Sequence, residues 1–162
     1  EQAAGEARRE LRRERAAVRA LRAREHRLDP DGHARLRGDI FEAWQRLTTP
    51  SDRRRYPWRE PAFGPDFAAS LRRVHGVDRR RLAEVCAEVV CGRAAERPGL
   101  ELHPLRVGEG GDTPQLVRED GAKAFRVALQ VHSPSARRLH YWLLPGGQVE
   151  FAKVVYHDDV SI

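Results

Sequence analysis

Arginine and histidine side chains recur among apolar residues in the C-terminal half of the chain, in segments with strand-like composition. Guanidinium groups suit phosphate binding, and imidazole groups suit proton transfer near neutral pH. The clustering of Arg with His, rather than of Lys with Glu, suggests that one face of the predicted sheet is functional. The polar residues of these segments are His103, Arg106, Arg118, Glu119, Asp120, Lys123, Arg126, His132, Arg137, Arg138, His140, Tyr141, His157, Asp158 and Asp159.

A second interpretation of the same residues requires no function. In a half-buried antiparallel sheet, alternate residues point to solvent, and charge on that face needs no special explanation. His103 and His140 have apolar neighbours, which favours a structural role for both, although either could join the basic face. Both interpretations stay open from the sequence.

The net charge of the chain is positive, because 30 Lys and Arg residues stand against 24 Asp and Glu residues, a formal charge of +6. Only Lys123 and Lys153 are lysines, so nearly all of the positive charge is arginine. An arginine bias can also reflect a GC-rich genome, which weakens the inference from arginine content to phosphate binding. The charge still predicts nucleic acid or another acidic molecule as the partner.

No segment resembles a signal peptide or a transmembrane span, since the longest apolar runs are only a few residues long. We therefore expect a soluble, cytoplasmic protein that binds no membrane. Cys86 and Cys91 are five residues apart in one expected helix and point to different faces, which predicts two buried free thiols rather than a disulfide. The chain lacks methionine even at its first position, so we expect an omitted start or a longer parent protein.

The established motifs for cofactors and metals are missing from the sequence. It has no phosphate loop, no G-x-G-x-x-G, no G-x-S-x-G, no H-E-x-x-H and no tandem C-x-x-C. His157, Asp158 and Asp159 are residue types that bind metals, but three adjacent residues on a strand cannot all face one ion. We expect neither a cofactor nor a metal.

Residues 1–28 have the composition of a long amphipathic helix with an apolar stripe on a seven-residue repeat. A second helix is expected to follow, up to about Leu47, and its apolar residues could pack back on this stripe. We therefore predict a helical hairpin or arm over residues 1–47, with helix-mediated self-association as an open alternative. The stripe consists of Ala4, Ala7, Leu11, Val18, Leu21 and Leu28.

Residues 48–65 contain four prolines and are expected to form a linker. The predicted domain over residues 66–162 begins with two short helices, which Asp66 and Asp78 can cap. Helices followed by strands predict an α+β fold, with two helices and a curled antiparallel sheet. The expected strands are 100–106, 115–119, 124–131, 138–144 and 148–157, with a hairpin turn at 145–147.

The order of these elements resembles the RelE/ParE toxin superfamily over residues 65–162. The resemblance also rests on a loose motif, in which a basic strand turns through a glycine-containing hairpin into an aromatic-Arg-Val strand. RelE-type members cleave messenger RNA in the ribosome without a metal, by attack of the 2′-hydroxyl on the neighbouring phosphate, whereas ParE-type members inhibit gyrase. The matching segments are 103–106, 115–121, 124–127 and 154–159, and the departures are the N-terminal third and the segments 108–114 and 133–145.

The resemblance implies catalytic roles for three residues. Arg126 is similar to the sheet arginine that stabilises the phosphorane charge, Arg118 to a basic residue beside it, and His157 to the general acid or base. Each residue also has an alternative: Arg126 could pair with Glu119 or Asp120, His157 could bond a backbone carbonyl, and Arg118 could be an exposed charge. The residues expected to bind the substrate are Arg106, Lys123, Arg137 and Arg138.

Two functions from different classes are consistent with the sequence. The first is a RelE-like toxin-type protein, a metal-independent mRNA endoribonuclease or a descendant of one, with RNA or the ribosome and an antitoxin as partners. The second is a non-catalytic binding module that uses its basic sheet face or its N-terminal helices. Catalysis needs a complete acid-base set, and for a second proton-transfer group the sequence offers Tyr141 and Tyr156 only by residue type. In a third hypothesis, the N-terminal helices form an arm that covers the basic face until a partner displaces it.

Overall fold

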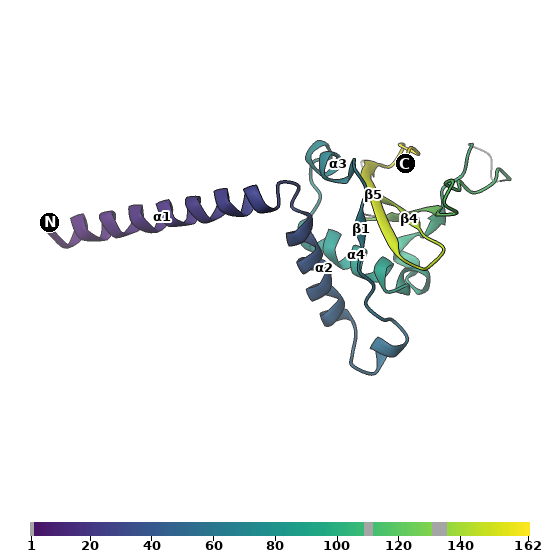
Figure 1. Cartoon of the computed structure of the whole chain (residues 1–162), viewed down its shortest axis with the longest axis horizontal. Helices are drawn as coiled ribbons and strands as arrows, with labels where there is room; N and C mark the ends of the chain where they lie inside the picture. The colour runs from purple at the N-terminus through teal and green to yellow at the C-terminus, as the bar shows by residue number, and fades with distance from the viewer. Residues whose placement is uncertain (1, 109–111, 131–135) are drawn as a thin grey trace. The chain divides into compact units, whose positions relative to one another are not determined.

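The computed structural model describes residues 2–108, 112–130 and 136–162, and it separates the chain into two compact units, Glu1–Arg35 and Leu36–Ile162. The described residues contain four α-helices and five strands of one sheet (Figure 1). The predicted residue His132 lies outside the described residues. The elements are α1 (Gln2–Leu28), α2 (His33–Leu47), β1 (Ala62–Phe63), α3 (Phe67–Arg73), α4 (Arg79–Val90), β2 (His103–Pro104), β3 (Lys123–Ala128), β4 (Arg137–Leu143) and β5 (Val149–Tyr156), with short 3-10 helices at Asp52–Arg54, Arg93–Glu96 and Pro98–Leu100.

The first unit consists mainly of α1, so the helix predicted for residues 1–28 is confirmed. Good helix formers such as Ala, Arg, Glu and Leu make up nearly all of it. The side chains of Leu11, Val18 and Leu21 on the predicted stripe are 46%, 46% and 65% exposed. None of the described helices is both long enough and apolar enough to cross a membrane.

The apolar face of α2 belongs to the core of the second unit. Leu36, Ile40, Ala43 and Trp44 are buried in one hydrophobic cluster with residues of α3, α4 and the sheet. We expected that apolar residues of this helix could pack back on the stripe of residues 1–28, but Leu36, Ile40 and Trp44 belong to the core of the second unit instead. Packing against an apolar sheet and two further helices removes a larger apolar area from water than one narrow stripe can. The second unit accordingly starts well before the predicted domain start at residue 66.

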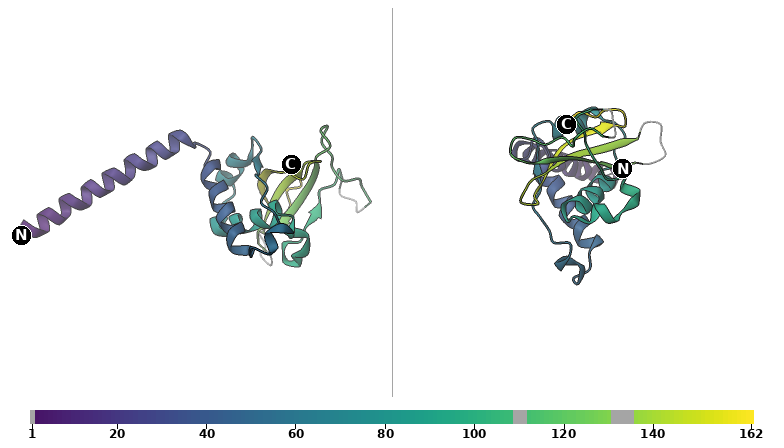
Figure 2. Two further views of the ribbon diagram at one scale, coloured as in Figure 1. Left: turned by 60° about the horizontal axis from the view of Figure 1, so that its bottom comes forward. Right: turned by 90° about the vertical axis from the view of Figure 1, so that its right-hand side faces the viewer.

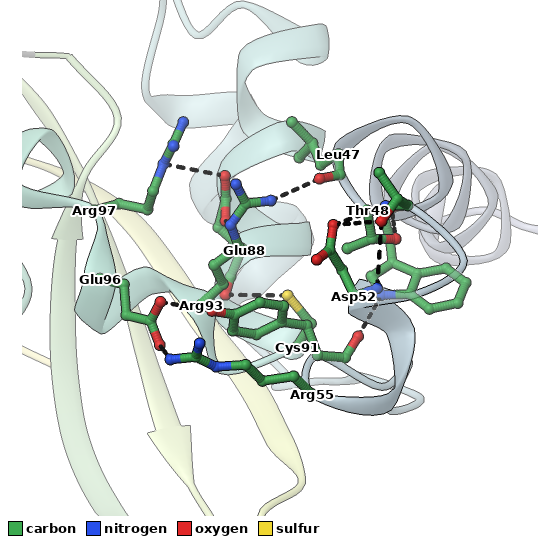
Figure 3. Close-up of polar contacts among 12 residues, drawn as sticks. Leu47, Thr48, Asp52, Arg55, Glu88, Cys91, Arg93, Glu96 and Arg97 are labelled. Carbon is green, nitrogen blue, oxygen red and sulfur yellow. Dashed lines mark hydrogen bonds and ion pairs between the residues drawn. The ribbon is translucent and has the colours of Figure 1, made fainter.

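Hydrogen bonds attach the proline-rich segment 48–65 to α2 and to the 3-10 helix Arg93–Glu96 (Figure 3). The Trp44 indole donates a hydrogen bond to the carbonyl of Tyr56 (2.9 Å), and the Tyr56 hydroxyl donates to Glu96 (2.6 Å). Glu96 also accepts from the Arg55 guanidinium at 2.8 Å. Arg93 completes the attachment, because it donates to the carbonyl of Leu47 (2.6 Å) at the end of α2.

The five strands form a mixed sheet in the order β1-β5-β4-β3-β2, in which β1 runs parallel to β5 and all other pairs are antiparallel. The predicted purely antiparallel sheet is therefore corrected by β1, whose two residues are too few to show alternation in the sequence. The strand predicted for 115–119 is also wrong, since this segment contributes only isolated bridges at Gln115 and Val117. The α+β class is confirmed, with helices before most of the strands.

Strand alternation separates an apolar face of the sheet from a polar one. One set of cross-strand neighbours packs against the helices, which lie on one side of the sheet (Figure 2). The alternate set lies on the opposite face, which no helix of the second unit covers. The helix-facing residues are Phe125, Val127, Leu139, Tyr141, Phe151 and Val154, and those of the helix-free face include Arg126, His140 and Lys153.

Helix α4 is the central helix of the core and has well-formed ends. The Asp78 carboxylate accepts a hydrogen bond from the backbone N–H of Arg81 (2.7 Å), and Gly92 adopts the left-handed conformation (φ 79°) just after the helix. Cys86 and Cys91 are buried free thiols, as predicted, and burial raises the pKa of both. Neither thiol is therefore reactive in the folded protein.

Candidate phosphate-binding face

Four titratable side chains form one line across the helix-free face of the sheet. The register pairs His103 with Arg126, Arg126 with His140, and His140 with Lys153, so the line runs from β2 to β5. Directly paired residues have Cβ atoms about 5 Å apart on the same face, so the four side chains are neighbours. We call these four residues the polar row.

Arg126 is the central cation of the polar row. Its guanidinium forms no hydrogen bond or ion pair with any residue that the structure describes. Burial and then the neighbouring charge of Arg138 lower its pKa, while Glu101 acts in the opposite direction. His103, directly opposite on β2, is exposed. This half of the row thus presents a poorly compensated positive charge beside an accessible imidazole.

His140 has the opposite environment, because its side chain is fully buried. Its Nδ1 lies 2.7 Å from the carbonyl oxygen of Ser161. A carbonyl only accepts, so Nδ1 carries the proton and Nε2 is an acceptor. Nε2 has no hydrogen-bond partner among the described residues. Burial lowers the pKa of His140 to about 4, so the imidazole is neutral at pH 7.

Residues 157–162, which we call the C-terminal segment, cover this half of the row. The Lys153 ammonium donates a hydrogen bond to the Ser161 hydroxyl at 2.6 Å. Asp159 holds Ser161 in place, since its carboxylate accepts from the backbone N–H (2.9 Å) and from the hydroxyl of that residue. The polar row is therefore divided into an open half on β2 and β3 and a covered half on β4 and β5.

Arg118 reaches the same face one row along the sheet, but carboxylates hold its guanidinium. It donates to Asp120 at 3.0 and 2.8 Å and to Glu150 at 2.9 and 3.2 Å, and it lies 5.1 Å from the centre of the Trp142 ring. These bonds raise the pKa of Arg118, and the bond from Arg118 lowers the pKa of Asp120 to about 2. The predicted catalytic Arg118 is thus compensated by two carboxylates, whereas Arg126 is not.

His157 lies beyond the end of β5 and outside the polar row. Its side chain is half exposed, and Nδ1 is 2.8 Å from the carboxylate of Asp158. The His157 carbonyl accepts a hydrogen bond from the Arg138 guanidinium (3.1 Å). Arg138 itself is on the helix-free face of β4, close enough to influence Arg126. Of the seven predicted site residues, Arg126 and Arg138 are the pair that the sheet brings together on this face.

Three other predicted substrate-binding residues point elsewhere. Lys123 and Arg137 alternate with Arg126 and Arg138 along their strands, which directs both toward the helix-facing side of the sheet. Arg137 donates to the carbonyl of His75 at 3.0 and 2.7 Å and so supports the connection after α3. Arg106 is exposed and donates to the carbonyl of Thr113.

A second charged cluster, around Glu88, serves the fold. Glu88 is buried on α4, and the Arg93 and Arg97 guanidinium groups lie 3.6 and 3.4 Å from its carboxylate (Figure 3). Arg93 is the same residue that holds the end of α2. Because every one of these charges already has a protein partner, the cluster joins helices and offers no open site.

From the sequence, His103 and His140 could join the basic face, whereas Lys153 was not among the predicted site residues. Their alignment with Arg126 depends on the register between strands, which a single sequence does not display. A bulge between His140 and Tyr141 shifts the alternation of β5 by one residue, so the sequence pattern of β5 does not show that Lys153 lies on this face.

No group of three or more His, Cys, Asp or Glu side chains suited to a metal ion occurs within the part of the chain that the structure describes. Comparisons with protein-family models, with curated proteins and with solved structures find no match to this chain.

Proposed function

We propose that the second unit binds single-stranded RNA on its helix-free face, with Arg126 as the main phosphate contact. The observation that carries this proposal is the guanidinium of Arg126, which forms no hydrogen bond or ion pair with a described residue and lies beside the exposed His103 and near the cation Arg138. A guanidinium without a carboxylate partner can hold two phosphate oxygens with charge-assisted hydrogen bonds. The RelE/ParE resemblance of the sequence supports RNA as the source of those phosphates.

The dimensions of the polar row support a nucleic-acid strand rather than a small anion. Four neighbouring strands carry the row, and three inter-strand spacings of about 4.8 Å give a length of roughly 14 Å. Such a row can contact more than one phosphate of a strand that crosses the sheet. Only the half with His103 and Arg126 is open to such a strand in this structure, because the C-terminal segment lies on the other half.

The test is the affinity of the full chain for a fluorescent single-stranded RNA, measured by anisotropy at two salt concentrations. Arg126→Ala should weaken binding about tenfold, the value of one charge-assisted contact, and should lower the salt dependence. The matched control is Arg54→Ala, which removes the same charge from an exposed position in a 3-10 helix away from the sheet. Equal effects of the two substitutions would refute a specific role of Arg126.

Metal-independent RNA cleavage is a second candidate function, favoured by the direct pairing of His103 with Arg126. In this reaction the 2′-oxygen forms a bond to phosphorus and the bond to the 5′-oxygen breaks. A base takes the 2′-hydroxyl proton and an acid returns one to the 5′-oxygen, which gives a 2′,3′-cyclic phosphate and a 5′-hydroxyl. His103 would transfer a proton, while Arg126 would stabilise the charge on the phosphorane.

Cleavage is tested by identifying the ends of RNA incubated with the full chain in the presence of a metal chelator, alone and on ribosomes. The expected products carry a 2′,3′-cyclic phosphate, and His103→Gln should abolish them while RNA affinity stays within twofold. Intact RNA in every condition, together with binding that depends on Arg126, would leave the protein as a binding module.

A further inference from the structure

The covered half of the polar row contains two groups that the proposed function does not yet use. His140 is fully buried, and its Nε2 has no hydrogen-bond partner among the described residues. The Lys153 ammonium donates to the Ser161 hydroxyl. Both groups are on the same face as Arg126 and in line with it. The imidazole donates from Nδ1 to the Ser161 carbonyl, and a buried polar atom without a partner, as Nε2 is among the described residues, calls for an explanation.

The C-terminal segment is held on this face by few contacts. Its hydrogen bonds to the sheet are those from His140 and Lys153 to Ser161, that from Arg138 to the His157 carbonyl, and that from the Asp159 backbone N–H to the Tyr156 carbonyl (3.0 Å). None of its side chains is buried, and Val160 is 60% exposed. A segment whose only partly buried apolar side chain is that of Ile162, and which four hydrogen bonds attach to the sheet, belongs to the low-stability end of the structure.

We propose that the C-terminal segment is a displaceable strap, and that its removal adds His140 and Lys153 to the RNA-binding site around Arg126. The strap takes the place of the ligand, because its Ser161 oxygens accept from the groups that would otherwise donate to phosphate oxygens. Opening would also hydrate His140 and return its imidazole to titration near neutral pH. The inference rests on the proposed function for its ligand, but the strap itself can be measured without RNA.

Loss of the Asp159 carboxylate is expected to shift the pKa of His140 in opposite directions, depending on whether the strap stays closed or opens. Burial lowers the pKa of His140 most strongly, and Lys153 on β5 and Arg126 on β3 lower it further, while the strap raises it through the hydrogen bond to the Ser161 carbonyl and the charge of Asp159. Loss of the Asp159 carboxylate from a strap that stays closed must therefore lower the pKa of His140 further. If the same change releases the strap, burial is lost and the pKa must rise toward the ordinary value of 6.5.

The experiment is an NMR titration of the histidine side chains in the full chain, with the His140 signal assigned by its loss in His140→Gln. Asp159→Ala removes the two hydrogen bonds that the Asp159 carboxylate accepts from Ser161. We expect the His140 pKa to rise by at least one unit. Asp158→Ala is the matched control, since it removes the same charge from a neighbouring side chain that contacts only His157 among the described residues. There we expect no change. A fall or no change in Asp159→Ala, or a pKa near 6.5 in the unaltered chain, overturns the strap.

RNA affinity of the same variants separates the strap from its ligand. Asp159→Ala should bind the RNA at least threefold more tightly than Asp158→Ala, and Lys153→Gln in the Asp159→Ala background should cancel the gain. If His140 titrates as expected but no variant binds RNA, the strap stands and both the proposed function and the assignment of its ligand are overturned. If RNA binds through Arg126 equally in both Asp variants, the covered half is no part of the RNA site.

Discussion

Arg126 and His140 are directly paired across β3 and β4, yet the guanidinium is charged and partly exposed while the imidazole is neutral and fully buried. The difference comes from what lies above each residue. The C-terminal segment covers His140 through Ser161, whereas no described residue forms a hydrogen bond or ion pair with the Arg126 guanidinium. One face of one sheet thus carries both an open cation and a protected base.

The first prediction concerns Arg118, whose role we infer to be structural. Arg118→Met leaves the half-buried carboxylate of Glu150 without its partner, and we expect a loss of about 1–2 kcal/mol in the free energy of unfolding. Urea denaturation measures this loss, and Glu150→Gln in the same background should recover part of it. Arg118→Met and Arg126→Ala each remove one positive charge, and we expect the RNA affinity to fall less in Arg118→Met. A larger fall would make Arg118 a phosphate contact.

The same substitution should change the titration of Asp120. Its pKa lies near 2 in the folded chain because Arg118 donates to it, below the ordinary value of 3.8. A lowered carboxyl pKa stabilises the folded state above the unfolded pKa, and this contribution disappears as the pH falls through about 4 toward 2. In Arg118→Met the Asp120 pKa should return toward 3.8, as followed by NMR of the carboxyl carbon. An unchanged pKa would assign the shift to the backbone N–H of Ala122 instead.

A third prediction compares the two residues that the sequence indicates as helix caps. Asp78 does cap α4 through the backbone N–H of Arg81, whereas the Asp66 side chain forms no capping bond to α3. Asp78→Ala should therefore cost about 1 kcal/mol of unfolding free energy, and Asp66→Ala should cost less than about half of that. Thermal or urea unfolding of the two variants tests this directly, and equal losses would contradict the difference in geometry.

The fold class was predictable because its signals are local. The periodicity of apolar residues indicates α1 and α4. Asp78 marks the start of α4 and Gly92 marks its end. The order of helices and strands indicates the α+β class. The site was less predictable because its signals are non-local. The resemblance selected both Arg118 and Arg126, and only the structure shows that Arg118 is paired with Glu150 and Asp120 while Arg126 has no such partner among the described residues.

The predicted linker shows the same limit from another direction. Prolines in 48–65 correctly indicate irregular backbone, but they do not show whether that backbone is attached. The attachment uses Tyr56 and Glu96, which are 40 residues apart, so no local pattern could have revealed it. Likewise the two residues of β1 join the sheet beside β5, far along the chain.

A fourth prediction tests the aromatic core on the helix-facing side of the sheet. Phe151 is fully buried on β5 and lies 5.9 and 6.1 Å, between ring centres, from Phe63 and Phe67. Phe151→Ala should leave a cavity and lower the free energy of unfolding by about 3–5 kcal/mol. Val160→Ala, at an exposed position, should change it by less than about 0.5 kcal/mol. A small effect at Phe151 would show that the sheet and helices do not share one cooperative core.

The last prediction concerns the attachment of segment 48–65 through Glu96. Glu96→Ala removes the acceptor of both the Tyr56 hydroxyl and the Arg55 guanidinium, while the rest of the core is untouched. Loss of two such hydrogen bonds, about 1–2 kcal/mol, should raise local opening roughly fivefold to thirtyfold.

Limited trypsin digestion with mass spectrometry measures that opening, because Arg53, Arg54 and Arg55 supply three consecutive cleavage sites in this segment. Glu119→Ala is the matched control, since it removes the same charge from an exposed turn on the far side of β3. Faster cleavage at 53–55 only in Glu96→Ala would establish that the segment is part of the folded unit by virtue of this contact. Equal rates in both variants would mean that Arg93 and Trp44 suffice to hold it, and that Glu96 is dispensable.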